Sequence, residues 1–164
     1  MELSVITPPD PAALPVAALR AQLRLGTGFA EATSQDGELV GFLAAAAAVV
    51  EARTGKALLA RGLRLVLADW RWSDAQALPV APVATVAGLT MRDRDGVASA
   101  VDPSRWSLRA DRHRPQIVAR GVVQPAIPPG GRVAFHLTAG FGPVWADVPA
   151  DLAQAVLLLA AEYY

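Results

Sequence analysis

The chain has 164 residues and a mass of 17.1 kDa, and its mean hydropathy is +0.32. An apolar fraction of 53% excludes a disordered chain, and fifteen basic against fifteen acidic residues exclude a general attraction to nucleic acid or anionic lipid. The absence of cysteine excludes disulfides, thiolate zinc sites and cysteine nucleophiles. We see no signal peptide, and residues 39–50, the longest uncharged apolar run, are too few to span a bilayer. We therefore expect a soluble protein made in the cytoplasm, with no membrane partner.

The N-terminal third predicts an extended arm and two helices. Residues 1–13 contain three prolines and read as the arm. Residues 14–25 carry an apolar stripe, with a proline near the first turn, where it is tolerated. Residues 36–54 repeat apolar side chains at helical spacing. Ser34 or Asp36 would cap this second helix, and Gly55 would end it.

The middle of the chain predicts short antiparallel strands. Alternating or β-branched runs cover residues 63–67, 83–91, 105–109, 116–119 and 132–139. Asp95-Gly96 after such a run is typical of a hairpin, so residues 86–92 should pair with 97–101. The prolines of 124–131 exclude a central strand in that segment.

The last helix, from about residue 149 to 164, is apolar on nearly every side. Between Leu152 and Ala161 its one polar side chain is Gln154, so we expect it to be buried all round, which a chain of this size achieves most easily against another protein. The predicted fold class is α+β: a three-helix bundle of residues 14–25, 36–54 and 149–164 with an inserted antiparallel β region. As a domain plan, residues 1–164 form a single domain, with a helical part (14–56 and 148–164) and a β insertion (57–147). The helices should share one core, formed by Leu19, Leu23, Phe42, Leu43, Ala46, Val49, Val156 and Leu159.

The polar residues predict no enzyme, no cofactor and no metal site. His113 and His136, the two imidazoles, have no cysteine or nearby glutamate to complete a ligand set, and no GxSxG nucleophile motif occurs. Asp93 and Asp95 are explained as turn formers. The GTG of residues 26–28 lacks the GK of a phosphate-binding loop.

Two groups of residues suggest interfaces. Six arginines in the β region form a solvated hairpin face, an inter-subunit salt-bridge surface or the lining of a DNA channel: Arg92, Arg94, Arg105, Arg109, Arg112 and Arg114. The four tryptophans, at 70, 72, 106 and 145, are either core residues or interface anchors.

An ordered series of segments resembles the head–tail connector (adaptor) proteins of long-tailed bacteriophages and gene-transfer-agent particles. The resemblance covers nearly the whole chain, although no single motif in it is specific. The series is QLRL (22–25), VEARTGKAL (50–58), LRLVLADW (63–70), LPVAPVATVAGLT (78–90), RDRDG (92–96), VDPSRW (101–106), HLTAGFG (136–142) and VPADLAQAVLLLAAEYY (148–164). The loop GTGFAEATSQDG (26–37) departs from the family, whose loop is typically more acidic.

The resemblance implies a virion protein at the head–tail junction, in a ring of about twelve subunits under the portal protein. The ring would extend the DNA channel without sequence-specific binding and would carry the next neck protein, the head-closure or stopper protein. The family's C-terminal helix and tail reach toward the portal, and the chain end predicts a further tail. This gives the portal-interface candidates Leu157, Leu158, Ala161, Glu162, Tyr163 and Tyr164. The alternatives are another neck or tail protein, such as a head-closure or tail-terminator protein, and a small ligand-binding domain.

Overall fold

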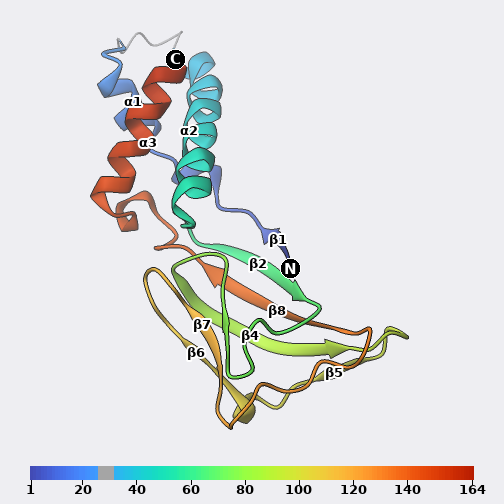
Figure 1. Cartoon of the computed structure of the whole chain (residues 1–164). Helices are drawn as coiled ribbons and strands as arrows, with labels where there is room; N and C mark the ends of the chain where they lie inside the picture. The colour runs from blue at the N-terminus through green and yellow to red at the C-terminus, as the bar shows by residue number, and fades with distance from the viewer. Residues whose placement is uncertain (26–31) are drawn as a thin grey trace. The chain divides into compact units, whose positions relative to one another are not determined.

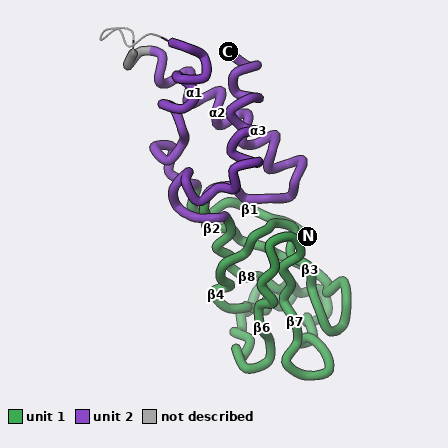
Figure 2. The backbone as a smooth tube through the Cα atoms, turned by 90° about the vertical axis from the view of Figure 1, so that its left-hand side faces the viewer, with its two compact units in different colours: residues 1–8, 60–140 green, residues 9–59, 141–164 purple. Residues whose placement is uncertain are grey.

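The computed structural model describes residues 1–25 and 32–164, with the side chains of 32–34 left aside (Figure 1). The backbone separates into two compact units (Figure 2). Unit 1 comprises residues 1–8 and 60–140, and unit 2 comprises residues 9–59 and 141–164. Each unit is therefore built from two segments, which are separated in the sequence by a segment of the other unit.

The larger sheet of unit 1 has five antiparallel strands in the order β1-β2-β8-β4-β5. Its strands are β1 (Glu2–Thr7), β2 (Arg61–Leu67), β4 (Val83–Arg92), β5 (Ala98–Ala100) and β8 (Arg132–Ala139). Strand β8 is central because its alternation buries Val133, Phe135 and Leu137 on one face. The opposite face of β8 presents Arg132 and His136 to solvent.

A smaller antiparallel sheet in the same unit has the order β3-β7-β6. Its strands are β3 (Ala75–Ala77), β7 (Gln116–Ala119) and β6 (Trp106–Arg109), the last preceded by the 3-10 turn η2 (Pro103–Arg105). Two buried glutamines support it. The side-chain amide of Gln124 donates to the Ile117 carbonyl (3.1 Å), and the Gln76 side-chain oxygen accepts from the Arg71 backbone N–H (3.0 Å). These bonds satisfy the Gln124 amide N–H and the Gln76 oxygen, while the Gln124 side-chain oxygen is buried without a partner among the described residues.

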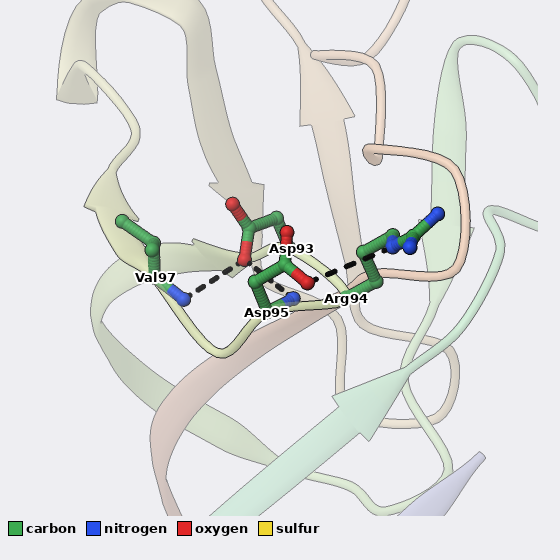
Figure 3. A network of polar contacts seen from close by, with 4 residues as sticks. All are labelled: Asp93, Arg94, Asp95 and Val97. Carbon is green, nitrogen blue, oxygen red and sulfur yellow. Dashed lines mark hydrogen bonds and ion pairs between the residues drawn. The ribbon is translucent and has the colours of Figure 1, made fainter.

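The predicted Asp-Gly hairpin is confirmed, but its pairing is shorter than the expected 86–92 with 97–101. Thr90, Met91 and Arg92 pair with Ala100, Ser99 and Ala98, respectively. As Figure 3 shows, one carboxylate oxygen of Asp93 accepts the backbone N–H groups of both Asp95 (3.0 Å) and Val97 (2.8 Å). Gly96 supplies the positive φ of +87° that the turn requires.

Unit 2 contains the helices α1 (Val16–Gln22), α2 (Ala32–Thr54) and α3 (Ala150–Tyr163), with short 3-10 turns η1 (Pro11–Ala13) and η3 (Trp145–Asp147). These helices bury one cluster that includes Leu19, Leu43, Ala46 and Val156, each with 0% exposure. Leu23, Phe42 and Leu159 are partly buried against it, as predicted. The prediction for Val49 is wrong, because Val50, the next residue, is the one that faces the cluster.

The predicted fold class, a three-helix bundle with an inserted β region, is wrong. The protein is an α+β structure with two antiparallel sheets and eight strands in its described part, beside three α-helices. The β region is not an insertion after the second helix, since residues 2–7 form strand β1 on β2. The prediction missed this strand because its partner lies some sixty residues away and its own side chains are all exposed. It therefore lacks the one-sided burial that identifies a strand in sequence.

At the ends of α2, the predicted N-cap is wrong and the predicted C-terminal glycine is confirmed. Ser34 and Asp36 lie inside the helix rather than at its N-cap, and the Asp36 carboxylate instead forms an ion pair with Arg20 of α1 (2.7 Å). Gly55 ends the helix in a left-handed conformation, with φ +67°, as predicted. The residues 26–28 and most of the loop that departs from the family lie outside the described part of the chain.

Candidate assembly surfaces

Helix α3 has a mostly polar stripe of exposed side chains that faces away from the core of its unit. Asp151, Gln154, Leu158 and Glu162 are exposed and follow one another at intervals of three or four residues, so they form one stripe along the helix. Leu158 lies near the middle of this stripe, and its side chain is 54% exposed. The expectation that this helix is buried on all sides is therefore wrong. It has a solvent-facing stripe, in which Leu158 lies between two acidic residues.

The portal-interface candidates lie together at the end of α3. Leu157 and Ala161 are partly buried beside the stripe, whereas Leu158, Glu162, Tyr163 and Tyr164 are exposed. The Tyr164 ring stands edge-on to Phe42 of α2, with 6.2 Å between ring centroids. This contact fixes the position of one aromatic ring while leaving it 54% exposed.

The six predicted arginines are all exposed, but they belong to two different sheets. Arg92 and Arg94 lie on the β4–β5 hairpin, where Arg92 donates to the Gly96 carbonyl (2.8 Å) and Arg94 lies 3.6 Å from the Asp95 carboxylate. The other four lie on η2, β6 and the β6–β7 turn: Arg105, Arg109, Arg112 and Arg114. The turn is organised by Asp111, whose carboxylate accepts two backbone N–H groups at 2.7 Å.

A groove of about 640 Å³ lies on the exposed face of the five-stranded sheet. Four arginines line it: Arg64 of β2, Arg132 of β8, and Arg92 and Arg94 of the hairpin. We call it the basic groove. Sequence reasoning found two of its arginines and missed Arg64 and Arg132. The available signal was the strand alternation of β2 and β8, which puts these two residues on the face opposite the buried leucines.

One carboxylate of unit 1 has a perturbed pKa. Hydrogen bonds from Ser104 to the Asp102 carboxylate, first among them the backbone N–H bond of 2.8 Å, lower the pKa of Asp102 below its ordinary value, and nearby Arg105 lowers it further. Asp102 thereby caps η2 and orients the chain that enters β6. Its role is structural.

Three of the four tryptophans are core or structural residues, and one is exposed as an interface anchor would be. Trp106 is buried, and the Trp70 indole N–H donates to the Pro125 carbonyl (2.8 Å), so these two are structural. Trp145 packs against the helical core. Trp72 is 62% exposed and is the member of the set that remains available as an interface anchor.

Within residues 1–25 and 32–164, no three His, Asp or Glu side chains are grouped so that they could hold a metal ion. In the same described part, no helix combines the length and the apolar character needed to cross a membrane.

No protein-family model matches the sequence, and no curated protein matches it. Solved structures do match along its whole length. A chain in the neck of an empty GTA particle, computed with C6 symmetry, is 52% identical with a TM-score of 0.94, and the match covers 100% of this chain and 84% of that one. A chain in the virion of a native gene transfer agent (GTA) particle is 52% identical, with a TM-score of 0.91 and the same coverage.

A third match is a chain in the neck of a native GTA particle, computed with C12 symmetry. It is 48% identical with a TM-score of 0.88, and the match covers 100% of this chain and 83% of that one. The predicted location in the neck of a virion is confirmed. With 52% identity over its full length, the chain belongs to the family of structural neck proteins of gene transfer agent particles.

Proposed function

We propose that the chain is the head–tail connector (adaptor) subunit of such a neck. In this role about twelve copies form a ring under the portal protein, extend the DNA channel and hold the next neck protein, the stopper. DNA passes through without sequence-specific binding. Similar chains occur in particle necks computed with C6 and C12 symmetry, and these symmetries support a ring.

The observation that carries the adaptor role is the exposed end of α3. A leucine that is 54% exposed, followed by two exposed tyrosines, is an unfavourable surface for a soluble chain and a favourable one for a contact. Burying the remaining half of a leucine side chain contributes on the order of 1 kcal/mol, and two tyrosines add large contact areas with polar ends. The resemblance assigns this end of the chain to the portal.

The alternatives predict a different partner for the same helix. A head-closure or tail-terminator protein would use it against another neck component, and a small ligand-binding domain would not need it at all. A ligand-binding domain would instead require a concave site with convergent polar groups that enclose most of a small molecule. Binding to isolated portal rings therefore separates the three functions.

The test is the Leu158→Asp variant of the full chain, measured for binding to portal rings by pelleting and mass photometry. Because Leu158 is half-exposed, the variant should keep its far-UV circular dichroism and still lose portal binding at least about tenfold, since the interface would bury a charge. Val122→Asp is the matched control, because Val122 is 90% exposed in unit 1 and its replacement should leave binding unchanged. Unchanged portal affinity of the Leu158→Asp chain would show that α3 does not contact the portal.

A further inference from the structure

We propose that the basic groove is the surface by which one copy of this chain holds its neighbour in the ring, and that the neighbour contributes its acidic unit 2. This inference rests on the proposed ring and names the contact that closes it. It concerns surfaces distinct from the exposed end of α3 (Leu158, Tyr163 and Tyr164) that we assign to the portal.

Two arginines of the basic groove are paired unfavourably across neighbouring strands. On the exposed face of the five-stranded sheet, Arg92 lies directly opposite Arg132 in the β4–β8 register, and like charges in that position destabilise a sheet. Arg64 lies opposite His136 in the β2–β8 register, so a third cationic side chain joins the same face without a facing carboxylate. Such an arrangement is stable when an external anionic group neutralises it.

The arginines nearest the sheet centre are available for that group. In the part of the chain that the structure describes, the guanidinium groups of Arg64 and Arg132 have no hydrogen-bond or ion-pair partner. Both side chains are exposed. Guanidinium groups bind carboxylates through paired hydrogen bonds, so two of them in one groove suit acidic side chains on a protein surface.

The rest of the groove favours a protein partner over DNA. Val66, Ala87 and Ala134 provide apolar lining between the arginines, and Glu2 and Asp93 place two carboxylates at the same surface. A phosphate backbone gains nothing from the apolar lining and is repelled by the carboxylates, whereas a protein surface with mixed side chains complements both.

The distribution of charge identifies that partner as a second copy. Unit 1 contains eleven arginines against seven acidic residues, which is an excess of four positive charges. Unit 2 contains four basic against eight acidic residues, which is an excess of four negative charges. A neutral chain divided in this way attracts its own kind head to tail, and this heterologous contact is the type that generates rings.

One acidic residue of unit 2 is suitable for the contact. Asp151 in the first turn of α3 is exposed and has no partner among the described residues. Asp151 lies about two turns from Leu158, so a neighbour bound there leaves the end of α3 free for the portal.

The experiment is a pair of charge reversals in the full chain. The groove variant carries Arg64→Glu and Arg132→Glu, and the helix variant carries Asp151→Lys. Portal rings are mixed with a limiting amount of each chain, and the number of copies per portal is counted by mass photometry. The wild type should give empty and full portals, because each bound copy recruits the next. With either variant alone, the number of copies per portal should be distributed at random. The chain concentration needed to fill half of the sites should rise at least about tenfold.

Mixing the two variants is the decisive measurement. Each variant then offers the charge that the other has lost, so an equimolar mixture should restore the all-or-none loading. Raising NaCl from about 0.05 M to 0.5 M shortens the Debye length from about 14 Å to about 4 Å and should weaken wild-type filling. A control chain with Arg109→Glu and Arg114→Glu reverses two exposed arginines outside the groove and should fill portals like the wild type.

The outcomes separate this inference from the adaptor role. If the groove variant fills portals cooperatively, or if the mixture is not rescued, the groove does not join copies, although the adaptor role stands. The same conclusion follows if the control chain fails equally, or if the groove variant forms normal rings and has lost only retention on DNA. If the wild type does not bind portals at all, the proposed function itself fails.

Discussion

Truncation of Leu43 should destabilise unit 2 by a predictable amount. This side chain is 0% exposed and lies in the cluster with Leu19, Ala46 and Val156. A Leu→Ala change at a fully enclosed site removes apolar burial and leaves a cavity, which together cost about 3 kcal/mol. With a urea dependence of about 2 kcal/mol per molar, the unfolding midpoint should fall by about 1.5 M.

The measurement is urea unfolding followed by circular dichroism at 222 nm, which reports mainly on α2 and α3. Leu158→Ala is the control, because that leucine is 54% exposed and its truncation should cost less than about 1 kcal/mol. Tryptophan fluorescence gives a second observable, since three of the four tryptophans lie in unit 1. Equal midpoints for the two variants would refute the assignment of Leu43 to the centre of the core.

Three further predictions concern unit 1. Asp93→Ala removes the acceptor of two backbone N–H groups and should cost about 1–2 kcal/mol in thermal unfolding, whereas Asp95→Ala, which loses one exposed ion pair, should change stability by less than about 0.5 kcal/mol. Gly131→Ala should lower the free energy of unfolding by about 1–3 kcal/mol, because its Cβ would collide with the Arg92 carbonyl oxygen, and urea titration of the soluble variant measures this change. Since the pKa of Asp102 is lowered on folding, its contribution to stability is present above its unfolded pKa and disappears as the pH falls through the folded value. A carboxyl titration by NMR should therefore place Asp102 below a model aspartate, and a pH-independent stability difference between the wild type and Asp102→Asn would contradict this.

Local signals in the sequence were enough for the elements whose partners are close or whose one face is buried. Strands β7 and β8 were predicted with their observed limits, and the Asp95-Gly96 turn located its hairpin. Local signals were insufficient for β1 and β3. Strand β3 has the sequence AQA and exists because it pairs with β7, and β1 exists because it pairs with β2. Pairing across such separations leaves no mark in the strand's own sequence.

The candidate surfaces show the same division. The end of α3 became a candidate because its leucine-rich sequence is conspicuous in a small chain. The basic groove was only half identified, since Arg92 and Arg94 are close in sequence while Arg64 and Arg132 reach the same face through the order of the strands. The six arginines looked like one cluster because they are near in sequence, yet the fold distributes them over two sheets.

The interleaving of the two units has a consequence for synthesis on the ribosome. Strand β1 is made first, but its sheet has no central strand until residue 139 has left the exit tunnel. Helices α1 and α2 likewise wait for α3, and until then the leucines of α2 lack part of their cover. The nascent chain therefore holds both units incomplete until β8 and α3 have been made. This ordering delays the appearance of two folded units until the segment that contains β8 and α3 has emerged.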